Sequence, residues 1–431
     1  MKQKTRTHLK RRRRLAFIFF CLLLLPLCIS CEDSDSSEGQ FNPNNPVEVT
    51  AIVPETGPIA LPLVIHGKNF GNDKSKIKVL FDDVQASVIT AKNEHLYVLN
   101  PRQTGGEHTV KVIVEDKEGV LKEKFDYIVT SSVSTVAGTG EQGDDDGNAL
   151  EATLAGPLYI SVDNKGNIII TEDYDYLRLL SLNESKVTTL LVDESTYGSC
   201  FSTDYSTLYV GIESRSIIAN EFDCTSNWLR TTTPNTVDME YGTAAMAVDN
   251  DGNVYYIGCL GEIARKDVRT DRISVIGHVN KEMIDTNVDY YAAYNPKDNH
   301  IYVSSRDEHI IIRFEAKESL KDEDFELYAG RRGESGLYNS TRLESTFNTP
   351  KGMAFDSRGN MYIADSRNNV IRMINPAGEV STFIGKPEGG HKDGSIEEAL
   401  FNRPCDVAIT PDDIIYVADC NNYRVRCIAI Q

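Results

Sequence analysis

The segment 347–385 constrains the fold of this chain most strongly, because it holds four short β-type runs in succession. The runs are Met353–Asp356, Met361–Asp365, Val370–Ile374 and Val380–Ile384, and Gly, Asn, Asp or Pro residues stand in each gap. Short runs separated by such turn residues are typical of an up-and-down antiparallel sheet. One four-stranded sheet has two apolar faces and cannot bury both by itself, so the pattern predicts neighbouring copies.

Copies of this unit recur along the chain and are marked by its second run. The six anchors are Ile168–Ile170, Leu208–Val210, Val254–Tyr256, Ile301–Val303, Met361–Ile363 and Ile415–Val417. Measured from the residue before each anchor, the steps are 40, 46, 47, 60 and 54 residues. A period of about 40–50 residues with four strands per unit predicts a β-propeller, here with six blades.

The last copy, Phe401–Ile430, contains only three of the four runs. The missing run has a counterpart before the first copy, because Ser134–Gly138 is similar to Ser381–Gly385. We therefore expect Ser134–Gly138 to form the outer strand of the last blade. This pairing would join the first and last repeats and would cover two sheet edges.

The copies resemble NHL-repeat propellers over roughly residues 132–431. The matching motifs are Asp356–Asn360, Ala364–Arg372 and Ala418–Arg426, in the blades where the resemblance is most specific. A long connector also recurs, as Gly138–Pro157, Gly330–Pro350 and Gly385–Pro404, and two of the three carry an Asp-Gly pair (Asp146-Gly147 and Asp393-Gly394). The resemblance implies a six-bladed, all-β propeller. NHL propellers often bind peptides or partner proteins.

Residues 46–130 are predicted to form a separate small all-β domain. About seven short alternating runs indicate an immunoglobulin-like sandwich. Pro54-x-x-Gly57 and Gly67-x-Asn69-Phe70-Gly71 resemble the IPT/TIG family, whose members in bacterial surface lipoproteins usually act as spacers. The fold expected is thus all-β, an immunoglobulin-like sandwich followed by the propeller at 131–431.

The N-terminal segment 1–31 is predicted to be a lipoprotein signal peptide. Four arginines, Arg11–Arg14, precede the apolar run Leu15–Ile29, which is too short for an ordinary transmembrane helix. The run ends at Cys31, and Leu27–Cys31 resembles the motif in which this cysteine receives the lipid. An ordinary cleaved signal peptide is the alternative.

Residues 32–45 are polar and predict a disordered tether. Glu32–Asp35 resembles the export tag of surface lipoproteins in polysaccharide-foraging Gram-negative bacteria. That resemblance implies an outer-membrane location, anchored through lipid and facing the cell exterior. The whole arrangement resembles accessory glycan-binding lipoproteins of polysaccharide uptake systems.

The charge of the chain argues against nucleic acid as a partner. The sequence has 45 Lys and Arg residues against 64 Asp and Glu residues. Residues 1–30 hold eight basic and no acidic residues, so the remainder has 37 basic residues and a formal charge of −27. Such a surface repels polyanions unless one patch is basic. Arg331-Arg332 is the one short candidate, and a solvated pair is the simpler interpretation.

No catalytic or metal-binding motif is evident in the sequence. The innermost strands, such as Ala245–Val248 and Met353–Phe355, are mostly small and apolar and supply few ligands for an axial metal. We therefore expect no enzyme activity, no cofactor and no metal; a lactonase- or lyase-like propeller is the alternative. Six cysteines remain after Cys31 without a Cys-x-x-Cys pair, either as disulfides or as buried thiols: Cys200, Cys224, Cys259, Cys405, Cys420 and Cys427.

A binding role has better support from the sequence. The connectors between strands two and three and between blades share one rim and are rich in Tyr, Asn, Asp and Gly. Aromatic faces stack on sugar rings, and carboxylates and amides bind sugar hydroxyls. We expect a neutral oligosaccharide on this rim, or alternatively a surface protein partner. The candidate residues are Tyr174, Tyr176, Tyr338, Asp365, Asn368, Asp419 and Asn422; for the last four, a structural role in the turns is the alternative.

Overall fold

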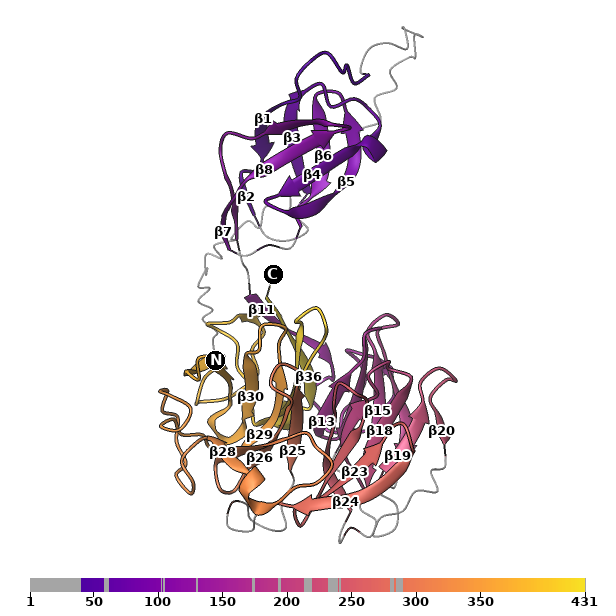
Figure 1. Cartoon of the computed structure of the whole chain (residues 1–431), viewed down its shortest axis with the longest axis vertical. Helices are drawn as coiled ribbons and strands as arrows, with labels where there is room; N and C mark the ends of the chain where they lie inside the picture. Colours follow the sequence, from indigo (N-terminus) through magenta and orange to yellow (C-terminus); the bar gives the residue numbers. More distant parts are fainter. Residues whose placement is uncertain are drawn as a thin grey trace, which may run out of the picture.

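The computed structural model is built almost entirely of strands (Figure 1). It describes residues 40–430 except for short internal gaps. The gaps are 58–61, 102, 104, 129–130, 173–174, 193–194, 213–218, 232–238, 240–241, 280–282 and 284–289. Cys31 and Tyr174 lie outside the described residues. None of the described segments forms a helix long and apolar enough to cross a membrane.

The N-terminal domain is a sandwich of two sheets, as predicted for an immunoglobulin-like fold. Its elements are β1 (Glu48–Val53), β2 (Thr56–Gly57), β3 (Pro62–Lys68), η1 (Lys74–Lys76), β4 (Ile77–Phe81), β5 (Val84–Lys92), β6 (His95–Leu99), β7 (Gly106–His108), β8 (Val110–Val114), β9 (Lys117–Val120) and β10 (Phe125–Tyr127). The strand orders are β1-β3-β6-β5-β4-β8-β9 and β2-β10-β7. Phe81 and Phe125 meet edge to face in the core, with ring centroids 5.3 Å apart.

The end of the predicted tether belongs to this domain. Asn69, at a left-handed backbone position, donates its side-chain amide to the carbonyls of Asn42 (2.9 Å) and Asn45 (3.0 Å). Phe41 packs against the sandwich core. The polar composition of residues 32–45 predicts disorder, but residues 40–45 are ordered against the sandwich. The Asn69 side chain provides hydrogen-bond partners for backbone carbonyls of this segment that would otherwise bind water.

The rest of the chain folds as a propeller in which the described residues form six sheets. The first three sheets contain β13 (Pro157–Val162), β14 (Asn167–Glu172), β15 (Tyr176–Ser181) and β16 (Lys186–Val192); β17 (Thr196–Phe201), β18 (Thr207–Ile212), β19 (Ala219–Asp223) and β20 (Leu229–Thr231); and β21 (Thr243–Val248), β22 (Val254–Gly258), β23 (Glu262–Asp267) and β24 (Arg272–His278). A short strand, β12 (Gly147–Asn148), adds to the first sheet.

The other three sheets have the same antiparallel order. They contain β25 (Tyr291–Asn295), β26 (His300–Ser305), β27 (Ile310–Glu315), η2 (Asp322–Asp324) and β28 (Glu326–Ala329); β29 (Pro350–Phe355), β30 (Met361–Asp365), η3 (Ser366–Asn368), β31 (Val370–Ile374) and β32 (Val380–Gly385); and β33 (Gly394–Ser395), β34 (Pro404–Ile409), β35 (Ile415–Asp419), η4 (Cys420–Asn422) and β36 (Arg424–Ile430). The first strand of each sheet contacts the first strands of the two neighbouring sheets, and β34 contacts β13, so the ring closes.

The closure predicted for the last sheet is confirmed. β11 (Ser131–Ala137) runs antiparallel to β36, with Ser131 opposite Ile430 and Ala137 opposite Val425. β11 lies between β36 and β33 in the sheet order. The N-terminal strand of the propeller therefore pairs with its C-terminal strand and covers an edge that would otherwise be open.

The Asp-x-x-Gly-Asn motif forms the turn between the first and second strands. Asp356 Oδ1 accepts the backbone N–H groups of Arg358 (2.9 Å) and Asn360 (2.8 Å), and its Oδ2 accepts the Asn360 side-chain amide (2.7 Å). Gly359 takes φ +92°, a conformation that favours glycine. Asp163 and Asp249 bond Asn167 and Asn253 in the same way.

The six cysteines among the described residues are free thiols. Cys405 is buried, and its sulfur lies 3.2 Å from Lys351 Nζ. Of the two alternatives left open by the sequence, the thiol form is the one in this structure.

Candidate functional site

Two of the predicted rim residues, Asp365 and Asp419, are buried beside arginines. Both carboxylates have an exposed fraction of zero. Asp365 Oδ2 accepts a hydrogen bond from Arg372 (2.9 Å), and Asp419 Oδ2 accepts one from Arg426 (2.8 Å). Burial raises the pKa of each carboxyl to about 6, and the neighbouring guanidinium partly offsets that rise.

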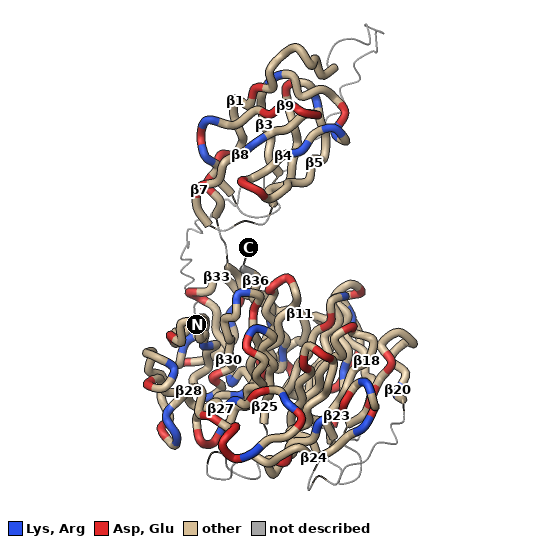
Figure 2. The backbone as a smooth tube through the Cα atoms, viewed as in Figure 1, with Lys and Arg blue, Asp and Glu red and all other residues tan. Residues whose placement is uncertain are grey.

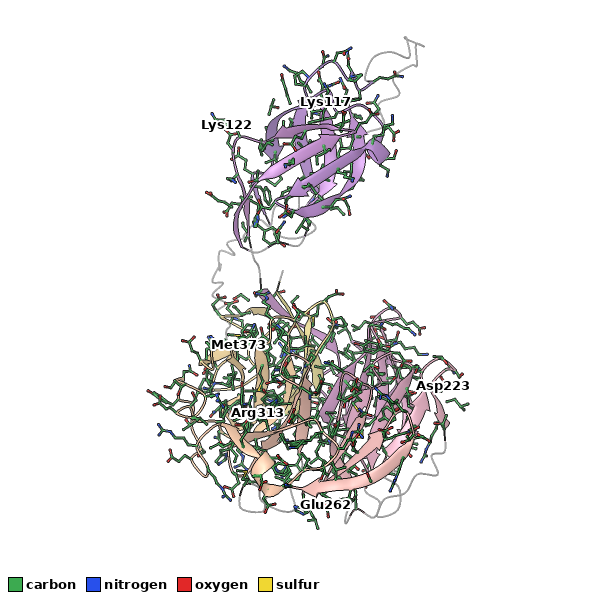
Figure 3. All side chains as sticks on the ribbon, in the orientation of Figure 1. Lys117, Lys122, Asp223, Glu262, Arg313 and Met373 are labelled. Carbon is green, nitrogen blue, oxygen red and sulfur yellow. The ribbon has the colours of Figure 1, made fainter. Side chains whose placement is uncertain are left out.

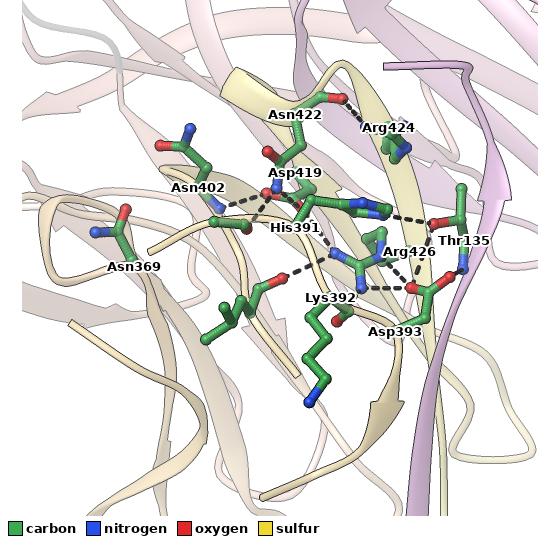
Figure 4. Close-up of polar contacts among 12 residues, drawn as sticks. Thr135, Asn369, His391, Lys392, Asp393, Asn402, Asp419, Asn422, Arg424 and Arg426 are labelled. Atoms are coloured by element: carbon green, nitrogen blue, oxygen red, sulfur yellow. Dashed lines mark hydrogen bonds and ion pairs between the residues drawn. The ribbon is translucent and has the colours of Figure 1, made fainter. Parts of the chain in front are cut away.

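In the fifth and sixth sheets, the connector that precedes the sheet completes the same network. Arg426 also donates to Asp393 (3.0 Å from Nε), as Figure 4 shows, and Arg372 donates to Asn339 (2.6 Å). The recurring Asp of a connector thus binds an arginine on the third strand of the next sheet and holds the connector against that strand. The first sheet repeats the arrangement with Arg178, Glu172 (3.1 Å) and Asp146 (2.9 Å).

The two predicted asparagines belong to these networks as well. Asn368 donates to Asp365 (2.8 Å) and to the Gly336 carbonyl (2.7 Å). Asn422 donates in the same way to Asp419 and to the carbonyl of Gly390, at 2.8 Å each. The hydrogen bonds of Asp365, Asn368, Asp419 and Asn422 therefore hold turns and connectors together, as the structural alternative describes.

The two predicted tyrosines that the structure describes, Tyr176 and Tyr338, are not brought together. Tyr338 is 59% exposed and its carbonyl accepts from Arg372, which places it over the fifth sheet. Tyr176 is half-buried at the start of β15, in the first sheet. The sixth sheet separates the fifth from the first in the ring, so these two rings do not form one stacking surface.

A cavity that the described residues form on the propeller axis opens on the opposite rim. It has a volume of about 510 Å³ and lies where the six first strands end and turn into the second strands. That volume falls in the range of about 300–1,000 Å³ that is typical of small-molecule sites. We call it the axial pocket. It is lined by apolar side chains (Val162, Met246, Val248, Met353, Val407 and Ile409), aromatic ones (Phe201, Tyr205, Tyr294 and Phe355) and polar ones (Ser161, Ser199, Ser202, Thr203, Asp356, Ser357, Thr410 and Asp413).

Three of the aromatic rings occupy equivalent places in the repeat. Phe201, Tyr294 and Phe355 lie at the ends of β17, β25 and β29. In each strand, the residue two positions earlier lines the propeller axis. The other three first strands carry Val or Ile at this position. The aromatic rings therefore line one part of the pocket mouth and aliphatic side chains line the rest.

Hydrogen bonds hold several polar side chains of the axial pocket in place. Ser161 and Ser199 join two first strands through their hydroxyls, which are 2.7 Å apart. Ser357 donates its hydroxyl to Asp413 (2.6 Å). The Tyr294 hydroxyl donates to Asn299 Oδ1 (2.9 Å). These contacts fix the polar groups before a ligand arrives, which reduces the entropy lost on binding.

The floor of the axial pocket is closed. Tyr159 and Tyr291, from opposite sheets, stack with ring centroids 4.4 Å apart. Beneath the pocket a small cavity of about 60 Å³ is lined by Asp406, whose carboxylate accepts the N–H groups of Ile160 and Val407, both at 2.8 Å. Burial raises the pKa of Asp406 well above its ordinary value. The axis is thus a blind pocket rather than an open channel.

No group of three or more His, Cys, Asp or Glu side chains that could hold a metal ion occurs among the described residues. The carboxylates that line the axial pocket, Asp356 and Asp413, accept hydrogen bonds from turn amides and a serine. This geometry suits turn formation.

The axial pocket was not predicted as a site from the sequence. The small and apolar inner strands argue against an axial metal, but their composition alone does not indicate a pocket. The available signal was the aromatic residue at the end of three of these strands.

Family models match both parts of the chain. An IPT/TIG domain matches residues 46–127, a teneurin NHL domain matches 232–392 and an NHL repeat matches 401–428. These matches confirm the two resemblances predicted from the sequence.

Curated relatives cover only part of the chain. Teneurin-3 of Danio rerio is 24% identical over 225 residues, which are 43% of this chain and 8% of teneurin-3. NHL repeat-containing protein 2 of Gallus gallus is 35% identical over 96 residues, which are 22% of this chain and 13% of that protein. The chain thus spans a small fraction of the length of these relatives.

Solved structures of similar fold cover almost the whole described chain. A Bacteroides thetaiotaomicron protein of unknown function superposes with a TM-score of 0.74 at 26% identity, over 91% of this chain and 100% of that one. A protein described as an auxiliary nutrient binding protein of Bacteroides ovatus gives a TM-score of 0.64 at 22% identity, with the same coverage of both chains. A Bacteroides thetaiotaomicron protein of the same description gives 0.61 at 21% identity, over 91% of this chain and 99% of that one.

Proposed function

We propose that this chain, which joins an IPT/TIG domain to an NHL-repeat propeller, binds a glycan in the axial pocket and does not catalyse a reaction. The observation that carries the proposal is the blind pocket of about 510 Å³ with aromatic rings at one side of its mouth and fixed hydroxyls around it. Aromatic faces stack on sugar rings while hydroxyls and carboxylates bind sugar hydroxyls. The description of two structural neighbours as auxiliary nutrient binding proteins supports a binding role.

Replacing two pocket tyrosines should weaken the binding of an oligosaccharide by about tenfold or more. Tyr205 and Tyr294 are partly buried and pack against core residues, so circular dichroism should confirm that the variant Tyr205→Ala with Tyr294→Ala is folded before it is titrated. Each stacked ring contributes on the order of 1 kcal/mol beyond area burial, and about 1.4 kcal/mol corresponds to a factor of ten. Calorimetric titration of the chain from residue 32 onward against neutral oligosaccharides measures this effect.

Tyr338→Ala is the matched control, because Tyr338 is exposed on the opposite rim. It should leave the affinity unchanged. Loss of binding in Tyr338→Ala, with full binding in the double variant, would move the site to the rim predicted from the sequence. If no glycan binds but a surface protein does, the propeller is an interaction scaffold instead.

The proposed location is the outer membrane, with a lipid on Cys31. In this proposal residues 32–39, which lie outside the described residues, are a flexible tether that would span roughly 16 Å. Cys31→Ala should abolish the incorporation of labelled palmitate and release the protein from the membrane fraction. Unchanged labelling in this variant would refute the anchor. An unmodified protein that is cleaved, secreted and unlabelled would indicate an ordinary signal peptide.

A further inference from the structure

A second cavity lies between the fourth and fifth sheets, directly beside the axial pocket. It has a volume of about 390 Å³, and Phe355 lines both cavities. Its walls come from the turn after β25, from β27 and β28, and from the turns that follow β29 and β31. Phe355 therefore stands between the axial pocket and this second cavity.

Four cationic side chains surround this cavity: Lys297, Arg313, Arg342 and Arg358. We call the cavity with these four residues the basic pocket. Asp298 is the single carboxylate among its lining residues. The whole chain carries a formal charge of −19, and Lys and Arg are interspersed with Asp and Glu over most of it (Figure 2). A lining with four cations and one carboxylate departs from that composition.

Within the basic pocket, only Arg313 has carboxylate partners among the described residues. Arg313, labelled in Figure 3, pairs with Glu326 (2.5 Å) and Asp298 (3.3 Å). No ion pair to a described carboxylate is formed by Lys297, Arg342 or Arg358. Lys297 and Arg358 are exposed at facing turns of the two sheets.

The aromatic wall holds the arginines in position. Arg342 stacks on Tyr328 with its guanidinium carbon 4.8 Å from the ring centroid, and it donates to the Tyr328 carbonyl (2.9 Å). Arg313 lies 5.2 Å from the same centroid. Lys297 reaches from the fourth sheet to the turn of the fifth, since a Cβ atom at Gly359 would lie 3.4 Å from its Nζ. Lys297, Arg342 and Arg358 lie close to Arg313 without a carboxylate partner of their own among the described residues, which favours the binding of an anion.

We infer that the basic pocket binds an anionic substituent, a carboxylate or a sulfate ester, of the sugar that occupies the axial pocket. This inference rests on the proposed function. The expected ligand is then no longer a neutral oligosaccharide. It carries a single negative group, on the sugar ring that lies at the aromatic side of the axial pocket. Arginine forks fit the two oxygens of a carboxylate or sulfate, and Lys297 supplies a mobile point charge.

Arginine modification tests the basic pocket without knowledge of the full glycan. The chain from residue 32 onward is treated with phenylglyoxal in the presence of glucuronate, inorganic sulfate or glucose, and each site is quantified by mass spectrometry. Glucuronate or sulfate should slow the modification of Arg342 and Arg358 at least threefold, and glucose should not. Arg367 is the internal control, because it is exposed on the opposite rim. Equal protection of Arg367, or no protection at all, overturns the inference.

A matched pair of variants tests the link to the sugar. Lys297→Gln with Arg358→Gln removes two unpaired charges from the basic pocket, while Lys386→Gln with Arg367→Gln removes two from the opposite rim. The first variant should bind a galactotriose that contains one galacturonate residue, or one sulfate ester, about tenfold more weakly than the second. Both should bind plain galactotriose as the unmodified protein does. A larger loss with galacturonate than with the sulfate ester identifies the carboxylate as the natural group, and the reverse identifies the sulfate.

Failure of the basic pocket and failure of the proposed axial site would give different results. Equal losses in both variants show bulk electrostatics and overturn the basic pocket as a specific site. Binding of neutral and acidic trisaccharides with the same affinity also overturns it, but leaves the axial pocket and the proposed function intact. Protection of Arg342 and Arg358 by glucuronate, together with no effect of Tyr205→Ala and Tyr294→Ala on any sugar, overturns the axial site instead.

Discussion

Deletion of β11, residues 131–137, is expected to lower the free energy of unfolding of the propeller by more than about 4 kcal/mol and to cause aggregation. β11 is paired with β36 along its whole length and buries Val133 and Ala137. Without it, the last sheet loses its outer strand, and β36 presents unpaired backbone groups to solvent. The ring is then held only by side-chain contacts between the first and sixth sheets.

Chemical unfolding followed by circular dichroism, with light scattering for aggregation, measures this loss. The control is deletion of residues 32–39, which belong to the predicted tether and lie outside the described residues; this deletion should leave stability unchanged. Residues 40–45 are kept, because Asn69 and Phe41 tie this segment to the sandwich. Equal stability of the two deletion variants would contradict the closure.

Arg372→Met is expected to destabilise the propeller by about 3–5 kcal/mol, because it leaves the Asp365 carboxylate buried without its partner. Both side chains have an exposed fraction of zero, and Arg372 also holds Asn339 and the Tyr338 carbonyl. Adding Asp365→Asn to Arg372→Met should recover part of the loss, since no buried charge then remains. Urea unfolding of the single and double variants provides the double-mutant cycle.

The loss in Arg372→Met should also depend on pH in a defined direction. Burial already raises the pKa of Asp365 to about 6, and removal of the guanidinium raises it further. A carboxyl whose pKa is higher in the folded than in the unfolded state binds its proton more tightly when folded. Stability of the variant should therefore fall as the pH rises from about 4 to 7, and its deficit relative to the parent should shrink at pH 5. A deficit that grows on acidification would contradict this origin.

The local rules of the fold were predictable because they repeat in the sequence. The Asp and Asn of the turn motif make the same hydrogen bonds in three of the sheets. The buried pair of Asp365 and Arg372 in the fifth sheet recurs in the sixth as Asp419 and Arg426. In the second, third and fourth sheets no such pair is present among the described residues, and their strands could be expected from periodicity alone.

The candidate site was not predictable in the same way. Recurring polar residues on one rim suggested ligand contacts, but burial shows that Asp419 and Asn422 serve the turns. Which end of the axis is open depends on the stacking of Tyr159 on Tyr291, residues far apart in sequence. The basic pocket depends on turns that come together only in the folded ring. Sequence periodicity reports which residues face the axis, but not how the ring brings separate turns into contact.

The most direct test of the central claim is a crystal structure of the chain from residue 32 onward with a bound oligosaccharide. Sugar density in the axial pocket, against Tyr205, Tyr294 or Phe355, is the result we predict. Density on the opposite rim, near Tyr176 or Tyr338, or a sugar bound to the sandwich with an empty axial pocket, would contradict it.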